Sequence, residues 1–218
     1  MFVITADQID SRNDHDRARE MITRLVALNP DAFTLAPDQT AGDEIQLLLS
    51  EAGPTLDAIL ALHRSGHWSV GLGIGTVRTP LPASTRQATG GAFIAARDAV
   101  LRSKRTEARF ALETDAAATN ETALGIEALL TMLLLLRQRR TRHGWEAGDL
   151  FESGLPQTEI ATALGVTTGA VSQRLKTAQY RVEQAARPAL VKMLEQLDHG
   201  PLATKIDETD GTAGASPF

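Results

Sequence analysis

Apolar residues recur at strand or helix spacing along most of the chain, and the pattern changes near residue 115. Short apolar runs, the first of them with β-branched residues, predict strands at 2–6, 33–36, 45–49, 68–77 and 108–112. Between these runs, apolar residues three and four positions apart predict helices at 14–28, 55–63 and 92–102. The first part of the chain therefore has the predicted order β-α-β-β-α-β, followed by α-β.

This order is typical of the ferredoxin-like split βαβ arrangement with one added α-β unit. The right-handed crossover rule leaves few other topologies. In that arrangement the first strand lies beside the third and antiparallel to it. The end of the first strand, at Asp7, then meets the start of the third strand, at Asp43. The predicted fold class is α+β, with a ferredoxin-like sandwich followed by an all-α helix-turn-helix domain.

The residues from Gln157 to Lys176, QTEIATALGVTTGAVSQRLK, have the pattern of a helix-turn-helix. Gly165 is expected to end the first helix, where a positive φ is needed. Thr167 is expected to cap the second helix through its hydroxyl. Apolar residues face inward, and small Ala161 sits where the two helices cross. We expect these helices to bind DNA; the alternative is a helical hairpin that makes protein contacts only.

The polar residues of the second helix fall on its outer side. Gln and Ser bond base edges, Lys reaches phosphate, and backbone N–H groups at a helix start favour an anion. The predicted DNA-binding residues are Gln157, Thr167, Thr168, Gly169, Ser172, Gln173, Arg174, Lys176 and Arg181. The stretch 150–194 resembles the C-terminal helical modules of LuxR-type regulators and sigma-factor region 4.

The stretch 122–141 predicts one long helix between the two parts, and its middle, EALLTMLLLL, is apolar nearly all round. Such a helix must be buried by something. It either fills the core of the C-terminal domain or packs against its copy in a dimer. A basic cluster follows, made of Arg137, Arg139, Arg140 and Arg142. The predicted domains are 1–116, a connecting helix at 117–142, a DNA-binding domain at 143–198 and a disordered acidic tail at 199–218, with the hinge at 115–120.

Charge and composition fit this division. The chain has a net charge of −5, yet residues 137–192 hold nine Lys and Arg against five Asp and Glu. DNA responds mainly to charge within a Debye length of about 10 Å, so the local excess matters more than the total. The chain has no Cys, which fits a reducing cytoplasm. No signal peptide is apparent, and the most apolar run, 129–136, is too short for a membrane span.

Two carboxylates brought to one sheet edge are a common way to hold Mg²⁺ together with phosphate oxygens. Asp7 and Asp43 are the predicted metal ligands. Backbone N–H groups of the loop 8–12 can cradle phosphates. The alternatives are that Asp7 and Asp10 only cap the following helix, and that Asp43 is a plain turn residue. The alternating Gly71, Gly73 and Gly75 predict close packing of a helix rather than a dinucleotide site.

Four short motifs resemble those of class III nucleotidyl cyclases. ADQIDS at 6–11 is similar to their first metal-binding motif, and AGDEIQ at 41–46 to their hairpin and that of GGDEF cyclases. VGLGIG at 70–75 resembles the following strand, and GGAFIAAR at 90–97 the helix that carries their transition-state Asn and Arg. Over residues 2–112 the chain also resembles the SatD family. The resemblance implies a palm-like, cyclase-like fold more than an activity.

The chain departs from the cyclase pattern at two positions. Phe93 stands where cyclases have the Asn that precedes the conserved Arg, which is Arg97 here, and Gln39 stands where they have the purine-selecting Lys. Loss of one such hydrogen-bond donor raises a barrier by about 2.7–4 kcal/mol. We therefore expect nucleotide or phosphate binding without efficient cyclisation. The predicted binding residues are Asp7, Gln8, Ile9, Asp10, Ser11, Arg12, Gly42, Asp43 and Arg97.

The sequence thus predicts a cytoplasmic, dimeric transcription regulator. Its N-terminal domain binds a nucleotide or related phosphate ligand, with Mg²⁺, and modulates DNA binding. One alternative is an enzyme, a nucleotide cyclase or nucleoside triphosphatase with a DNA-binding tail. Another is an N-terminal domain that serves only for folding or interaction.

Overall fold

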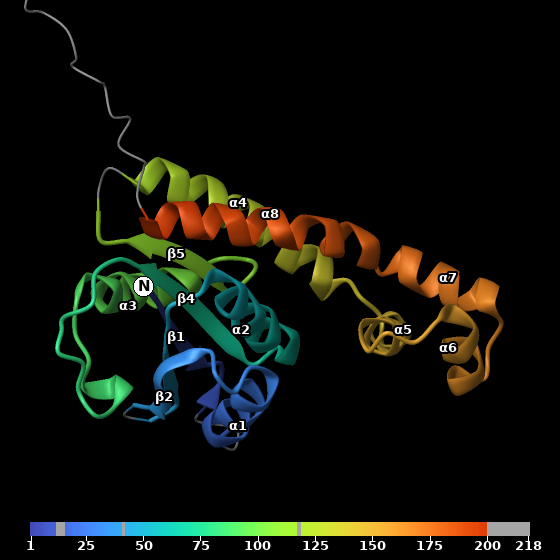
Figure 1. Cartoon of the computed structure of the whole chain (residues 1–218), viewed down its shortest axis with the longest axis horizontal. Helices are drawn as coiled ribbons and strands as arrows, with labels where there is room; N and C mark the ends of the chain where they lie inside the picture. Colours follow the sequence, from blue (N-terminus) through green and yellow to red (C-terminus); the bar gives the residue numbers. More distant parts are fainter. Residues whose placement is uncertain (12–15, 41, 117–118, 200–218) are drawn as a thin grey trace, which may run out of the picture.

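A mixed sheet of five strands lies at the centre of the larger part of the molecule (Figure 1). The computed structural model describes residues 1–11, 16–40, 42–116 and 119–199. The strands are β1 (Phe2–Gln8), β2 (Phe33–Gln39), β3 (Glu44–Leu49), β4 (Trp68–Ile74) and β5 (Phe110–Thr114), in the order β2-β3-β1-β4-β5. Neighbouring strands are antiparallel except β4 and β5, which are parallel. The fold is therefore α+β, and the predicted antiparallel pairing of the first and third strands is confirmed.

Helices cover both faces of this sheet. Alternate residues of β1, such as Phe2 and Ile4, belong to the core shared with α1 (Ala18–Leu28), α2 (Ala52–Ser65), α4 (Asn120–Gln138) and α8 (Tyr180–His199). On the other face, Val3 packs with Ala92 and Ala96 of α3 (Gly91–Ser103). A short 3₁₀ helix, η2 (Thr85–Gln87), lies beside β2 and β3. None of the helices in the described ranges is long and apolar enough to span a membrane.

The predicted order of elements is confirmed, but several bounds differ. β1 runs on to Gln8 and β2 to Gln39, each beyond the end of the predicted strand. β4 stops at Ile74, three residues before the predicted end, although the Gly75 N–H still bonds to the Met1 carbonyl. The helix predicted over 122–141 begins at Asn120 and ends at Gln138. Its end is set by Thr141, whose hydroxyl accepts the Gly144 N–H and so begins a new helix.

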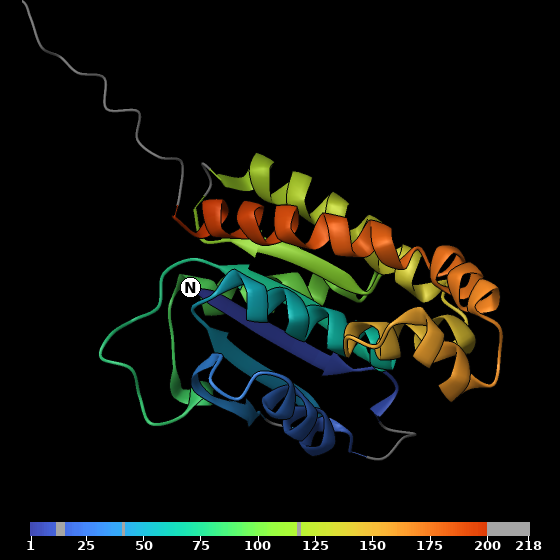
Figure 2. The same cartoon turned by 45° about the vertical axis from the view of Figure 1, so that its right-hand side comes forward.

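The chain leaves the sheet through α4 and returns through α8. Leu190, Leu194 and Leu197 of α8 pack in the same core as Ile126 and Leu130 of α4. The inner side of α4 is therefore buried against β5, α2 and α8, and it does not fill the core of a separate C-terminal domain. Figures 1 and 2 show α4 and α8 side by side over the sheet.

Three helices stand between α4 and α8, at the far end of both (Figure 2). They are α5 (Arg142–Glu152), α6 (Gln157–Leu164) and α7 (Thr168–Thr177), and we call them the three-helix unit. This unit has a small core of its own, built from Ala147, Ile160, Ala161, Val171, Leu175 and Tyr180. The last residue of that list begins α8, so α8 takes part in both cores.

Side chains satisfy the free edge of β5. Glu127 of α4 accepts the Leu112 N–H at 2.6 Å, and Arg102 of α3 donates to the Leu112 carbonyl at 2.9 Å. Arg102 and Glu127 also pair with each other at 2.5 Å, and this hydrogen bond raises the pKa of Arg102. Side chains bonded to an edge strand in this way hinder the pairing of a further strand. They also connect α3 on one face of the sheet to α4 on the other.

Two glycines of β4 let α3 lie directly on the strand, as their alternation predicts. A β-carbon at Gly71 would lie 2.2 Å from the Val100 backbone nitrogen, and one at Gly73 would lie 2.1 Å from the Ala92 carbonyl oxygen. Real atoms do not approach this closely, so any side chain at these positions must push the helix off the sheet.

We expect Gly71→Ala to lower the free energy of unfolding by roughly 1–3 kcal/mol or more, because the clash is with helix backbone. Urea unfolding followed by circular dichroism measures the change. Gly53→Ala in α2 is the matched control, since a β-carbon there has no atom within 4 Å. The control should be neutral or slightly stabilising. Equal stability of the two variants would contradict this explanation of the glycine pattern.

Candidate functional site

The turn between α6 and α7 has the geometry that the sequence predicts. Gly165 ends α6 with a φ of +63°, and the Val166 N–H bonds to the Ala161 carbonyl at 3.0 Å. Thr167 caps α7, accepting the Ala170 N–H on its hydroxyl at 3.1 Å. Together these local bonds fix the angle at which α7 follows α6.

The inner sides of α6 and α7 hold them against α5 and the start of α8. Ile160, Val171 and Leu175 are buried as predicted, and Ala178 is buried beyond the end of α7. Phe151 meets Tyr180 edge to face, with ring centroids 5.6 Å apart. The orientation of α7 is therefore set by packing on one side, which leaves its other side for contacts outside the chain.

That outer side of α7 is polar and contains no acidic residue. Most of the predicted DNA-binding residues on it are exposed, namely Thr168, Gly169, Ser172, Gln173 and Lys176, with Thr167 and Arg181 exposed at either side. Arg174 is half-buried. Gln157, at the start of α6, lies with Ser172, Lys176 and Arg181 around a shallow groove of about 230 Å³. The fold thus brings residues from three helices to one surface, which we call the α7 surface.

The four arginines predicted to form a basic cluster before α5 do not form one exposed basic surface. The side chains of Arg137 and Arg140 are buried, and both pair with the buried Glu183 of α8. Of the four arginines, Arg139 and Arg142 are exposed, and Arg142 pairs with Glu146 on its own helix. The prediction is wrong because Glu183, far away in the sequence, draws two of the four side chains inward.

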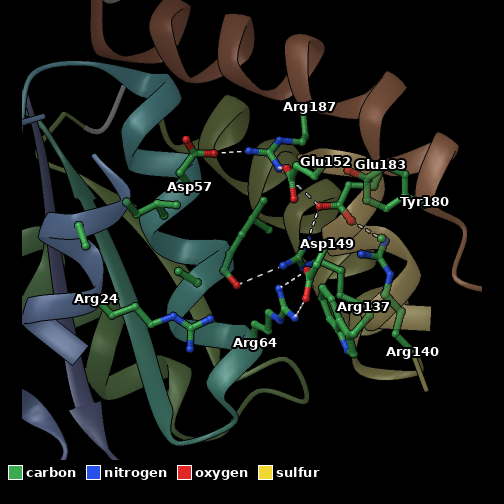
Figure 3. A pocket seen from close by; sticks show the side chains of 16 residues that line it. Arg24, Asp57, Arg64, Arg137, Arg140, Asp149, Glu152, Tyr180, Glu183 and Arg187 are labelled. Atoms are coloured by element: carbon green, nitrogen blue, oxygen red, sulfur yellow. Dashed lines mark hydrogen bonds and ion pairs between the residues drawn. The ribbon is translucent and has the colours of Figure 1, made fainter. Parts of the chain in front are cut away.

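Charged side chains hold the three-helix unit against the sheet part of the molecule, and we call the region where they meet the joint (Figure 3). Arg187 of α8 pairs with Asp57 of α2, and Arg64 of α2 makes two bonds of 2.7 Å to Asp149 of α5. The Trp145 ring lies under three guanidinium groups, those of Arg64 at 4.2 Å and of Arg137 and Arg140 at 4.8 Å. A hollow of about 390 Å³ lies between the two parts at this joint.

Burial has clear electrostatic effects at the joint. It lowers the pKa of Arg137 to about 10, although the neighbouring Glu183 acts in the opposite direction. Burial, followed by the positive charge of Arg137, lowers the pKa of His63 to about 4. His63 is therefore neutral at pH 7, and its ring contacts the Gln138 side chain at 3.1 Å.

The other predicted site lies where β1 ends and β3 begins. Asp7 is opposite Glu44 in the register, and the Gln8 N–H bonds to the Asp43 carbonyl at 3.2 Å, so the predicted approach of these two chain segments is confirmed. Gly42 has a φ of +88°, as a tight turn requires. The Asp7 carboxylate pairs with Lys104, at the end of α3, at 2.7 Å.

The loop that follows β1 uses some of its groups within the protein. The Ile9 N–H bonds to the His67 carbonyl at 2.8 Å, and the buried Gln8 side chain accepts the Arg17 N–H at 3.0 Å. Asp10 has a φ of +54° and is exposed, while Ser11 is half-buried. Arg12 lies outside the described residues. Within the described ranges no group of three His, Cys, Asp or Glu residues can hold a metal ion.

Arg97 lies apart from that loop, exposed on α3. It lines a wide, open hollow of about 550 Å³ with Gln39, Thr40, Gln46, Arg86 and Gln87. Thr5 is opposite Gln46 in the register, and strand alternation places both on the α3 side of the sheet. Thr5 is fully buried, and its hydroxyl has no hydrogen-bond partner. We call the hollow lined by Arg97 and these five neighbours the α3-side hollow; Thr5 lies beneath it and is not part of its lining.

The sequence predicts Arg97 as a binding residue and singles out Gln39, but it does not predict the other residues around them. The available signal is Gln46, a polar residue inside the otherwise apolar stretch IQLLL of β3. Successive side chains of β1 alternate between the two faces of the sheet, and this places the predicted nucleotide-binding residues apart. Asp7 points to the α3 side, while Gln8 points to the opposite face. The predicted nucleotide-binding residues thus fall on two sides of the sheet.

Comparisons of the chain with protein-family models, with curated proteins and with solved structures found no match.

Glu183→Gln should lower the free energy of unfolding by roughly 3–5 kcal/mol, because it leaves two buried guanidinium groups without a counter-charge. Urea unfolding measures the loss. Glu146→Gln is the control, since its partner Arg142 is 89% exposed and exposed pairs contribute about 0–1 kcal/mol. A loss for Glu183→Gln as small as that of the control would contradict the structural importance of the joint.

Proposed function

We propose that this protein is a DNA-binding transcription regulator in which α6 and α7 act as a helix-turn-helix. The observation that carries the proposal is the α7 surface, which is polar, basic and exposed on a helix whose other side is fixed by packing. α7 then enters the major groove. The Gly165 turn and the Thr167 cap support this, because they are the local features that such a motif needs.

The residues of the α7 surface divide by chemistry. Ser172 and Gln173 are exposed on α7 and can donate to and accept from base edges. Lys176 and Arg181 supply positive charge beside the groove and suit phosphate contacts. Thr168 and Gly169 stand in the first turn, where backbone N–H groups favour a phosphate.

We further propose that the sheet part, a ferredoxin-like, palm-like domain, binds a nucleotide or another phosphate ligand in the α3-side hollow. Arg97 offers an exposed guanidinium there, and the side-chain amides of Gln39 and Gln46 offer further hydrogen bonds. The sheet edge itself fits Mg²⁺ less well. Asp7 is already neutralised by Lys104, so the proposal includes no step that depends on a metal.

Phe93 packs against the apolar residues on the α3 side of the sheet, one helical turn before Arg97. A phenyl ring donates no hydrogen bond, and the position lacks the donor that cyclisation requires. The hollow therefore favours a binding role over a cyclase or triphosphatase role.

Lys176→Ala should weaken binding to a labelled 30-base-pair duplex and make binding less sensitive to salt, with the slope of log affinity against log salt reduced by about one. Fluorescence anisotropy at several salt concentrations measures both quantities. Lys192→Ala, at an exposed position of α8, is the matched control and should leave the slope unchanged. Equal slopes for both variants would remove α7 from the interface.

Thermal unfolding with ribo-, deoxyribo- and cyclic nucleotides tests the ligand. A bound ligand at 100 times its dissociation constant adds roughly 2.7 kcal/mol of stability, which appears as a raised Tm. We expect a selective rise that is lost in Arg97→Ala. Arg19→Ala, exposed on α1, is the control and should keep it. No rise with any nucleotide, or the same rise in Arg97→Ala, would refute binding in the α3-side hollow.

A further inference from the structure

The outer side of α4 carries an apolar surface. Leu124, Leu129 and Met132 are 61%, 44% and 68% exposed, and Gly125 and Ala128 lie exposed between them. Leu136 continues the same side half-buried. These six residues form what we call the α4 stripe. Single exposed apolar residues are ordinary, but a continuous stripe over three turns of helix marks an interaction surface.

The stripe has no covering element in the part of the chain that the structure describes. The opposite side of α4, including Ala123, Ile126, Leu130 and Leu134, already fills the core beneath it. Figures 1 and 2 show α4 as the outer layer on this side of the molecule, with α8 beside it. The apolar character of α4 all round its axis is therefore explained on one side only.

Association through the edges of the sheet is hindered. At β5, Arg102 and Glu127 already occupy the backbone groups of Leu112. At β2, Pro37 lacks an N–H, and the Thr85 hydroxyl of η2 bonds to the Ala36 carbonyl at 2.7 Å. Both devices reduce strand pairing between copies. A helix face is then the better surface for self-association.

The α4 stripe is complementary to itself when two copies run antiparallel about Leu130. In that register Leu124 faces Leu136 of the second copy, and the small Ala128 faces the large Met132. At each end, Glu121 of one copy faces Arg139 of the other, and both residues are exposed. Large side chains thus meet small or apolar ones, and opposite charges meet at the rim.

We propose that two copies of this chain pair through α4 in this antiparallel register, about a twofold axis near Leu130. Such an isologous contact uses the same surface on both copies, and each pairing therefore occurs twice. The Glu121–Arg139 pairs set the direction and register, because a parallel arrangement would bring like charges together at both ends.

Pairing places the two three-helix units at opposite ends of the assembly. α4 has 19 residues and is about 28 Å long. If the proposed DNA-binding function holds, the dimer reads an inverted repeat whose half-sites lie one helical turn of DNA, about 34 Å, or a multiple of it apart. The dimer itself does not depend on that function, so its test uses no DNA.

Sedimentation velocity of the full chain at micromolar concentration should give the mass of a dimer. Met132→Glu should give a folded monomer, because pairing would then bury two carboxylates, one from each copy, near the axis of the pair. Ile94→Glu on α3 is the matched control, since Ile94 is 67% exposed and lies away from α4; it should remain dimeric. Circular dichroism checks that both variants are folded.

Charge exchange tests the antiparallel register directly. Glu121→Arg and Arg139→Glu should each weaken the dimer by about tenfold or more, since each places like charges at both ends. The double variant, with both changes, should recover wild-type association. A monomeric wild-type chain, a dimeric Met132→Glu variant, or a double variant no tighter than the single ones would overturn the proposal.

Discussion

The structure depends most on one buried carboxylate, that of Glu183, which holds Arg137 and Arg140 out of water between α4 and α8. Buried ion pairs add little net stability compared with apolar packing, but removal of one partner leaves an uncompensated charge. The contact of Glu183 with the two arginines therefore matters chiefly because it fixes how the three-helix unit is attached to α4 and α8. The chain leaves the sheet at Arg137 and returns at Glu183, so this contact closes the base of the three-helix unit. Rotation of that unit about its base would expose or separate these charges.

What the sequence predicts well is set by local rules. The Gly165 turn and the Thr167 cap depend on neighbours within one or two turns of helix, and both are present as predicted. The close contact of α3 with β4 follows from the absence of a β-carbon at Gly71 and Gly73. The antiparallel pairing of β1 with β3 follows from the order of elements and the rule on crossovers.

The features that the sequence does not predict depend on contacts between residues far apart in the chain. Arg137 and Glu183 are 46 positions apart, and no pattern near Arg137 distinguishes a buried guanidinium from an exposed one. The same limit applies to Arg97, whose neighbours in the α3-side hollow come from β2, β3 and η2. A sequence motif can also group adjacent residues wrongly into one site. Asp7 and Gln8 belong to the same predicted motif, yet they point to opposite faces of one strand. The face that a strand residue occupies is decided by the whole sheet.

The α3-side hollow and the joint lie on opposite faces of the sheet, so communication between them needs a physical connection. The side chains at the β5 edge provide one, because Arg102 lies on the same helix as Arg97 and pairs with Glu127 of α4. α4 in turn carries Arg137 into the joint. A ligand at Arg97 acts on the three-helix unit only if it binds one placement of α3 more tightly than another. The Arg102–Glu127 pair then transmits that placement to α4, the helix that also carries the α4 stripe. In a dimer paired through α4, a shift of this helix changes the orientation of both three-helix units at once.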